Sequence, residues 1–278
     1  MNKTELEFLL DKYNLTPNKI RGQNFLISDE VLDKIISAEQ ISKSDLVLEI
    51  GPGLGALTSR LVKEARQVVA FEVDKNFKKP LDKLSALAGN LEIFWQDILS
   101  LSTRQLADIL EKHKSKQYKV VANIPYYLTA KFIQKFIQNK YQPETMVLML
   151  QKEVAERIVS KDKKESKLSL SLAFYAQSRI ASLVGKENFY PSPKVDSAII
   201  VIEKIKAWSY EADEKLTWQL IQRGFASKRK KLINNLLSDP KLNKEKLTAV
   251  FLEIGLDLNI RAEKLSVDNW LILAKKIG

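Results

Sequence analysis

The sequence contains no cysteine, a single histidine and no long apolar run. Without cysteine, the chain can form no disulfide, no thiolate nucleophile and no cysteine-ligated metal site. The single His113 stands in a polar run over residues 111–117, which predicts a solvated position, so we expect no metal centre. No apolar stretch approaches the ~20 residues that span a bilayer, and the first residues lack the pattern of a signal peptide. These absences predict a cytoplasmic protein that does not enter a membrane.

The charge of the chain is unbalanced. The 278 residues include 45 Lys and Arg against 34 Asp and Glu, which gives a formal net charge of +11 at pH 7. Residues 191–278 hold 16 of the basic and 11 of the acidic residues, so the C-terminal part is the denser positive region. A surplus of this size favours a polyanionic partner such as nucleic acid or an acidic membrane, although a merely basic enzyme would show it as well.

Short apolar runs alternate with helical patterns through the first two thirds of the chain. Strands are predicted at residues 46–50, 68–71, 91–95, 118–122, 145–150 and 197–202. Helices are predicted between several of them. This alternation predicts an α/β fold with a mostly parallel sheet and helices on both faces. After residue 205 only helical periodicity remains, so we expect a first domain over residues 1–206 and a small all-helical domain over residues 207–278.

A glycine-rich turn follows the strand at residues 46–50. Gly51, Gly53 and Gly55 let the backbone turn tightly and let a ligand approach closely, and the following helix offers free N–H groups. Glu72 closes the next strand 21 positions after Gly51, where an acidic residue accepts hydrogen bonds from ribose hydroxyls. Asp97 closes the third strand. The three sites share the carboxyl edge of the sheet, which predicts a nucleoside-binding site there.

The glycine turn fits two classes of cofactor. The spacing from Gly51 through Gly53 to Ala56 matches the dinucleotide fingerprint, so an NAD-dependent oxidoreductase stays open. Glu49 stands two positions before Gly51, where a carboxylate could meet the ammonium group of a methionine moiety. The Gly-x-Gly-x-Gly spacing also suits a single nucleoside with no pyrophosphate. On these residues S-adenosylmethionine is favoured over NAD.

The run Asn123-Ile124-Pro125-Tyr126 follows the strand at residues 118–122 and so lies at the same edge. The amino group of a base is a poor nucleophile because its lone pair is delocalised into the ring. The Asn123 oxygen and the Ile124 carbonyl, aimed by Pro125, could hold the amine hydrogens and favour a more reactive nitrogen. Tyr126 offers a flat face for stacking a base. An ordinary proline turn would give the same residues, but their place beside the glycine turn favours methyl transfer by proximity.

These motifs together resemble those of the small-subunit ribosomal RNA adenine dimethyltransferases. The likeness runs nearly end to end, in ordered runs that begin at Gln23, Glu49, Phe71, Asp97, Asn123, Phe189, Arg223 and Arg261. It implies a Rossmann-like class I methyltransferase domain, a helical C-terminal domain and S-adenosylmethionine as cofactor. It also implies dimethylation of two adjacent adenosines in a hairpin loop near the 3′ end of small-subunit rRNA during ribosome biogenesis. The expected partner is this rRNA within a pre-ribosomal particle, and a monomer is the expected state.

The resemblance also implies roles for individual residues. The cofactor contacts that it implies are Asn24, Leu26, Gly51, Glu72, Asp97 and Asn123. The first three would meet the methionine side, Glu72 the ribose and Asp97 the adenine amino group. Asn123 would also lie beside the target amine, and Tyr126 and Phe189 would sandwich the flipped adenine.

A basic cluster lies in the predicted helical domain. Lys228, Arg229, Lys230 and Lys231 follow Arg223, and we expect all five residues on one helix. At helical spacing Arg223 and Lys230 would share a face. Such a cluster could contact RNA phosphates and make binding depend on salt. The alternative is a solvated basic face without a ligand.

Three other functions stay open at the level of sequence. The erythromycin-resistance methyltransferases share the catalytic motifs but modify large-subunit rRNA, and the C-terminal runs at residues 255–258 and 261–265 look more like the small-subunit family. An NAD-dependent oxidoreductase would give no role to residues 123–126 or to the basic cluster. A ribosome assembly factor that merely keeps the fold would bind RNA without transferring methyl groups.

Overall fold

The computed structural model describes residues 1–18, 22–124, 128–159 and 164–278. Within these ranges the chain packs into two compact units. The first contains residues 1–159 and 176–205, and the second contains residues 206–278 together with the segment that ends at residue 175. The sequence places that segment with the first domain. In the structure its helix packs on the C-terminal helices, since the Phe174 and Tyr175 rings lie against Trp208 and Trp218.

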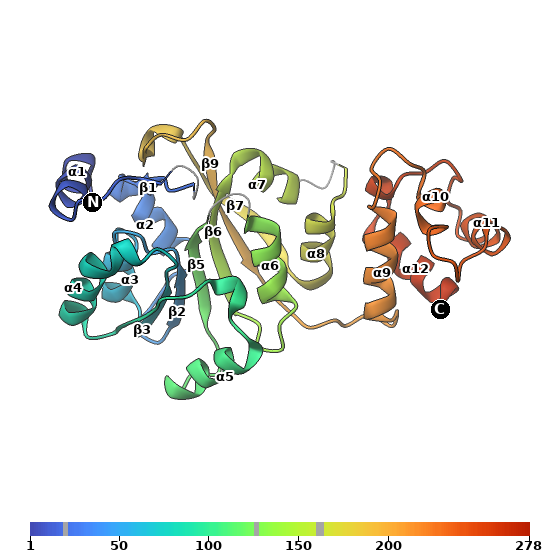
Figure 1. Cartoon of the computed structure of the whole chain (residues 1–278). Helices are drawn as coiled ribbons and strands as arrows, with labels where there is room; N and C mark the ends of the chain where they lie inside the picture. The colour runs from blue at the N-terminus through green and yellow to red at the C-terminus, as the bar shows by residue number, and fades with distance from the viewer. Residues whose placement is uncertain (19–21, 125–127, 160–163) are drawn as a thin grey trace. The chain divides into compact units, whose positions relative to one another are not determined.

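A seven-stranded sheet forms the centre of the first unit (Figure 1). Its strands are β2 (Leu46–Ile50), β3 (Gln67–Phe71), β4 (Leu91–Phe94), β5 (Lys119–Asn123), β6 (Thr145–Gln151), β7 (Gln177–Val184) and β9 (Ser197–Glu203). Their order is β4-β3-β2-β5-β6-β9-β7. The strands from β4 to β6 are parallel, and β9 pairs antiparallel with both β6 and β7. The strand order reverses between β2 and β5, which is where sheets of this kind bind ligands.

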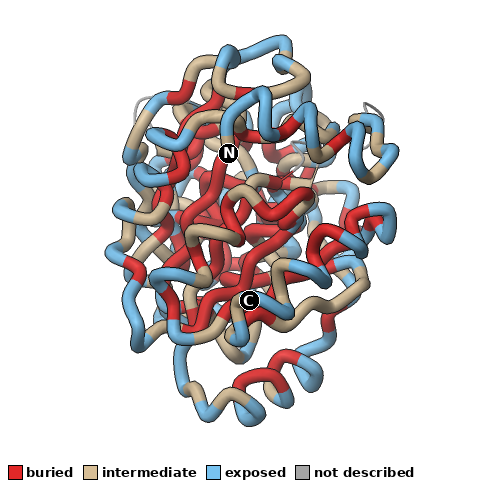
Figure 2. The backbone as a smooth tube through the Cα atoms, turned by 90° about the vertical axis from the view of Figure 1, so that its left-hand side faces the viewer, coloured by how far each residue is buried: buried red, intermediate tan, exposed pale blue. Residues whose placement is uncertain are grey.

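Helices cover both faces of this sheet. They are α2 (Asp29–Ser37), α3 (Thr58–Glu64), α4 (Lys78–Ala88), α5 (Thr103–Lys112), α6 (Thr129–Ile137) and α7 (Lys152–Val159), with α1 (Lys3–Lys12) ahead of them. Val31 and Leu32 of α2 and Leu61 of α3 pack in one cluster with Val47 of β2 and Val121 of β5. All five residues of β2 are buried, as expected for a central parallel strand covered on both sides. Figure 2 shows these central strands as buried segments inside partly exposed helices. The predicted α/β fold is therefore confirmed.

Short elements shape the carboxyl edge of the sheet. They are the 3₁₀ turns η1 (Lys75–Phe77), η2 (Ile98–Ser100) and η4 (Lys186–Asn188), and the strands β1 (Phe25–Leu26) and β8 (Phe189–Tyr190). β1 and β8 form a separate two-stranded antiparallel sheet. This pairing joins the start of the chain to the loop before β9.

The second unit is helical throughout its described residues. It contains α8 (Lys167–Tyr175), α9 (Glu214–Gly224), α10 (Leu232–Leu236), α11 (Lys244–Glu253), the turn η5 (Ala262–Lys264) and α12 (Val267–Ile277). Its core contains the fully buried Trp270 with Leu220, Leu232 and Phe251. The predicted helical C-terminal part is confirmed. In the described part of the chain, no helix combines the length and the apolar character that a membrane crossing needs.

Candidate active site

The glycine turn joins β2 to α3 at the reversal point of the sheet. Gly51, Gly53 and Gly55 have φ angles of +72°, +56° and +83°, which residues with a Cβ rarely adopt. A Cβ on Gly53 would come within 3.3 Å of the Phe25 ring. The turn therefore needs glycine for its shape, and β1 packs against its middle.

Glu72 follows β3 and is buried beside the glycine turn. Its Oε1 accepts hydrogen bonds from the backbone N–H groups of Val73 and Asp74, each at 2.8 Å, and its Oε2 accepts one from Gly53 at 3.1 Å. Burial raises the pKa of Glu72, and these three hydrogen bonds oppose the rise. A carboxylate has room for about four such bonds, so Glu72 keeps acceptor capacity for a ligand hydroxyl.

Asn123 and Asp97 follow the same edge. Asn123 ends β5 and donates through Nδ2 to the carbonyl oxygen of Asn24 at 3.5 Å, and no hydrogen bond to its Oδ1 is found among the described residues. Asp97 follows β4 and caps η2, where its Oδ1 accepts from the N–H of Leu99 at 2.8 Å. Two predicted site residues thus lie at the ends of strands on either side of β2 and β3.

The pairing of β1 with β8 brings two distant predictions together. Leu26 lies opposite Phe189 in this small sheet, and both side chains are almost fully buried. The resemblance implies a cofactor contact for Leu26 and a contact with the target base for Phe189. Their pairing places the predicted base-binding ring beside the predicted cofactor contact.

One cavity of about 400 Å³ collects most of the predicted residues. Its lining includes Asn24, Leu26, Gly51, Gly53, Glu72, Asp97, Asn123, Ile124 and Phe189. The volume lies within the range of roughly 300–1,000 Å³ that is common for small-molecule sites. The structure therefore brings most of the residues predicted for the cofactor and the base to the wall of one cavity.

Glu49 and Gly55 do not line this cavity. Glu49 sits within β2 at 1% exposure, below the glycine turn, and its Oε2 has no hydrogen-bond partner among the residues that the structure describes. Burial raises the pKa of Glu49 to about 8; the Thr58 hydroxyl opposes this rise and the charge of Glu72 adds to it. Gly55 faces α4, where a Cβ would come within 2.8 Å of Leu84. The predicted cofactor contacts of Glu49 and Gly55 therefore stay predictions.

Sequence reasoning missed a link between Gln23, which lines the cavity, and Asp74. The Gln23 Nε2 donates to Asp74 Oδ2 at 2.9 Å, and the Gln23 Oε1 accepts from the N–H of Asn18 at 2.8 Å. Asp74 in turn donates its own N–H to Glu72. Gln23 and Asp74 stand inside the runs that carried the family resemblance, but only their contact in space reveals what they join.

Gln96 is a second residue that the sequence did not single out. It lines the cavity just before Asp97, and its Nε2 is buried without a partner among the described residues. A buried donor with no acceptor is costly and usually marks the place of a ligand or water. Polar residues before strand-end acids are common, so no sequence signal distinguished Gln96.

Two residues of the predicted chemistry motif lie outside the described ranges. They are Pro125 and Tyr126, which follow Ile124. Ile124 itself is buried and lines the cavity. The motif therefore starts at the cavity wall, and the roles of Pro125 and Tyr126 stay predictions.

The basic cluster is not on one helix, and this prediction was wrong. The helix α9 ends at Gly224, and Lys228 to Lys231 occupy the turn before α10. The buried Asn235 explains the break, because its Nδ2 donates to the carbonyls of Gly224 and Ser227 at 2.6 and 2.9 Å. A Cβ on Gly224 would also come within 2.5 Å of Trp270. Close packing and an amide cap therefore end the helix before the lysines begin.

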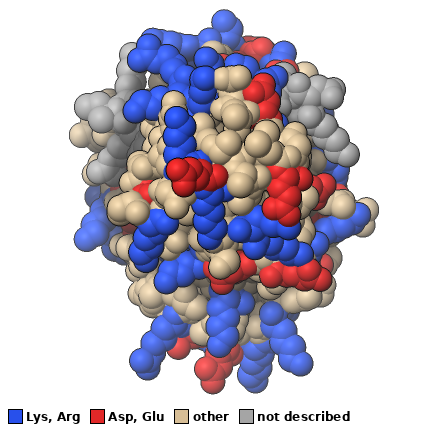
Figure 3. All heavy atoms as spheres, turned by 90° about the vertical axis from the view of Figure 1, so that its right-hand side faces the viewer, with Lys and Arg blue, Asp and Glu red and all other residues tan. Residues whose placement is uncertain are grey.

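The five basic residues also differ in their surroundings. Arg223 pairs with Asp239 at 2.5 Å, and Lys231 donates to Asn259. Lys228, Arg229 and Lys230 are exposed. Figure 3 shows many Lys and Arg side chains on the face that it presents. Lys231 is exposed too, so Lys228 to Lys230, for which no side-chain partner is shown among the described residues, are the members best placed to meet a polyanion.

Comparison with known proteins gives a consistent result. The family described as ribosomal RNA adenine dimethylase matches residues 14–278. A ribosomal RNA small subunit methyltransferase A from Ligilactobacillus salivarius is 39% identical over 282 aligned positions, covering 98% of this chain and 94% of that protein. One from Dehalococcoides mccartyi is 37% identical, with coverage of 94% and 89%.

Solved structures agree with this result. A dimethyladenosine transferase from Plasmodium falciparum superposes with a TM-score of 0.69 at 26% identity, covering 90% of this chain and 95% of that one. The 23S rRNA methyltransferase ErmE superposes with a TM-score of 0.67 at 22% identity, covering 91% and 99%, and this likeness concerns the fold alone. By sequence match over nearly its whole length, the chain belongs to the ribosomal RNA adenine dimethylase family.

Proposed function

We propose that this chain transfers methyl groups from S-adenosylmethionine to N6 of two adjacent adenosines near the 3′ end of small-subunit rRNA, giving N6,N6-dimethyladenosine. The observation that carries the proposal is the single cavity in which the glycine turn, Glu72, Asp97 and Asn123 meet. Membership of the rRNA adenine dimethylase family supports it. The small-subunit target rests on the names of the relatives that match nearly end to end.

The cavity residues fit S-adenosylmethionine. The carboxylate of Glu72 can accept from ribose hydroxyls, and the second oxygen of Asp97 can accept from an adenine amino group. The buried Nε2 of Gln96 offers a donor that lacks a partner among the described residues. The glycine turn leaves room for close approach, and Asn24 and Leu26 line the wall near it. Bound there, the cofactor would supply an electrophilic methyl group on sulfur.

The chain's own contribution to the reaction is orientation. The Asn123 Oδ1 accepts one hydrogen of the target amine, and the Ile124 carbonyl is the expected second acceptor. Both acceptors favour a nitrogen whose lone pair points out of the ring plane. Phe189, with the predicted Tyr126, would hold the flipped base by stacking, which is worth about 1–3 kcal/mol per base. Holding amine and methyl in line lowers the barrier without a strong base.

The partner and setting form part of the same proposal. The substrate is rRNA within a pre-ribosomal particle in the cytoplasm, with the enzyme acting as a monomer. Residues 207–278 serve as an rRNA-binding domain through Arg223 and the exposed segment from Lys228 to Lys231. The net charge of +11 supports a polyanionic partner.

The test is methyl transfer from labelled S-adenosylmethionine to purified, undermethylated small subunits and, in parallel, to naked large-subunit RNA. We expect N6,N6-dimethyladenosine from small subunits, with the kcat of Asn123→Ala reduced by about 10²–10³. The matched control is Asn139→Ala, a partly exposed asparagine after α6, which should keep full activity. Label only in large-subunit RNA would assign the chain to the erythromycin-resistance type, and no label despite cofactor binding would favour an assembly factor.

A further inference from the structure

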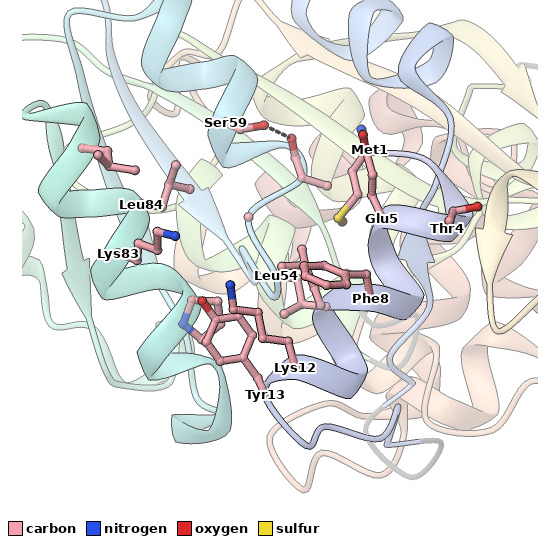
Figure 4. Close-up of a pocket in the computed structure, with 15 residues that line it drawn as sticks. Met1, Thr4, Glu5, Phe8, Lys12, Tyr13, Leu54, Ser59, Lys83 and Leu84 are labelled. Atoms are coloured by element: carbon pink, nitrogen blue, oxygen red, sulfur yellow. Dashed lines mark hydrogen bonds and ion pairs between the residues drawn. The ribbon is translucent and has the colours of Figure 1, made fainter.

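A second hollow adjoins the cofactor cavity, between α1 and α4 (Figure 4). This α1–α4 groove encloses about 700 Å³. Its walls are mostly apolar, and include Phe8, Leu9, Tyr13, Leu54, Leu84 and Leu87. Leu54 and Ala56 of the glycine turn line both the groove and the cofactor cavity, so the two hollows share a wall.

Two cations point into the groove from opposite sides. Figure 4 shows the side chains of Lys12 on α1 and Lys83 on α4 directed into the space between the helices. Neither ammonium group has an ion-pair partner among the residues that the structure describes. The only carboxylate in the described lining is Glu5, which accepts from the N–H of Asn2 at 2.9 Å and lies 3.9 Å from the N-terminal ammonium. The unbalanced charge of the groove is therefore positive.

An aromatic face stands next to these cations. Phe8 is 62% exposed and points from α1 into the groove, and Leu87 on the opposite helix is 77% exposed. The Lys12 ammonium lies 5.5 Å from the centre of the Phe8 ring and 5.8 Å from that of Tyr13. Large apolar side chains left in water on both walls favour a flat apolar ligand between them.

We propose that the α1–α4 groove binds one unpaired nucleotide of the RNA substrate. Its base stacks on Phe8 and Leu87, and its phosphate lies between Lys12 and Lys83. Aromatic stacking beside a cation is the chemistry by which single-stranded nucleic acid is held without sequence preference. The inference rests on the proposed function, because it takes the substrate to be RNA. It adds an anchoring point on the far side of the glycine turn from the cavity that holds the target base.

The test measures KM for small-subunit particles at saturating S-adenosylmethionine, together with its dependence on salt. Phe8→Ala should raise this KM at least about 5-fold, since a lost stack weakens binding by that factor or more, and Phe8→Tyr should restore it. Lys12→Met and Lys83→Met should each lower the slope of log affinity against log salt by about 0.7. Lys63→Met and Leu183→Ala, exposed residues outside the groove, are the controls and should change neither quantity.

Three results would overturn the inference. If the parent enzyme is active but Phe8→Ala and Lys12→Met change neither the KM nor the salt slope, the groove does not bind RNA. A change confined to the KM for S-adenosylmethionine would make the groove a support for the cofactor cavity only. Loss of a parent dimer in Phe8→Ala, measured by sedimentation, would assign the groove to a second copy of the chain. Failure of the proposed function is distinct, because the parent enzyme itself would then transfer no methyl group to rRNA.

Discussion

Short sequence runs predict the conformation of both the glycine turn after β2 and the basic segment after α9. The turn lies where the sequence predicts it, whereas the basic segment does not form the predicted helix. In the turn, Gly51, Gly53 and Gly55 all have positive φ, and the loop lies at the predicted edge of the sheet. In the basic segment, the expected helix stops at Gly224. The difference shows that backbone conformation limited to glycine can be read locally, whereas a charged run takes whatever conformation its buried neighbours impose.

The largest effect on stability is expected at Glu49, which lies in β2 before the glycine turn. Burial raises the pKa of Glu49 to about 8 from an ordinary 4.5. Between these values the folded chain holds a proton that the unfolded chain releases, so the free energy of unfolding falls as pH rises. Glu49→Gln removes this pH dependence. The free energy of unfolding of the variant should therefore rise relative to that of the parent by up to about 1.4 kcal/mol per pH unit from pH 5 to 8.

Urea unfolding of Glu49→Gln and the parent at each pH measures this effect. Below pH 4.5 the difference in the free energy of unfolding between the two proteins should be constant. Glu111→Gln, an exposed glutamate in α5, is the control and should show no such slope. Parallel pH profiles for Glu49→Gln and the parent would mean that Glu49 is ionised in the folded chain.

The second-largest effect on stability is expected from the contact between the glycine turn and α4. Gly55→Ala places a Cβ at positive φ and within 2.8 Å of Leu84, which should cost about 2–4 kcal/mol of unfolding free energy. Gly89→Ala is the matched control, because Gly89 also has positive φ but has nothing within 4 Å, so it should cost only about 1–2 kcal/mol. Thermal unfolding compares them. Equal losses would show that α4 does not press on the turn, and Leu84→Ala should recover part of the loss at Gly55.

The smallest expected effects distinguish the roles of Lys230 and Arg223 in RNA binding and in stability. Lys230→Met should lower the slope of log RNA affinity against log salt by about 0.7–0.9, because an exposed lysine acts through phosphate contacts. Arg223→Met should in addition lower stability, since it leaves Asp239, which is 10% exposed, without its cation. Filter binding across salt concentrations and urea unfolding give both quantities. If the salt slope changes only in Arg223→Met, the RNA contact lies on α9 and not in the segment that contains Lys230.

The sequence predicted most of the sheet because buried parallel strands form continuous apolar runs. The strand at residues 46–50 has the predicted bounds. The strand β7 was missed because it lies at the edge of the sheet and alternates polar with apolar residues, as at Arg179 and Ile180. A register shift between Ile180 and Ser182 breaks its alternation further.

The site was predictable where chemistry and backbone geometry coincide. Glu72, Asp97 and Asn123 each follow a strand, and that position alone places them at one edge. The hydrogen bond from Gln23 to Asp74 joins residues 51 positions apart, so no pattern in the local sequence predicts it. Glu49 shows the converse limit, because its motif position suggests a ligand contact, whereas the structure buries it within β2 and outside the cavity lining.

The link between Gln23 and Asp74 bears on how fast the enzyme can exchange its cofactor. Two adenosines that each accept two methyl groups require four molecules of methyl donor for each rRNA. Just before β1, Gln23 donates to Asp74 and Asn24 accepts from Asn123, and each of these side-chain hydrogen bonds is worth about 1 kcal/mol. Breaking these two hydrogen bonds would leave the strand pairing of the central sheet intact. Product release would then be a local event, and the rRNA could stay docked between successive transfers.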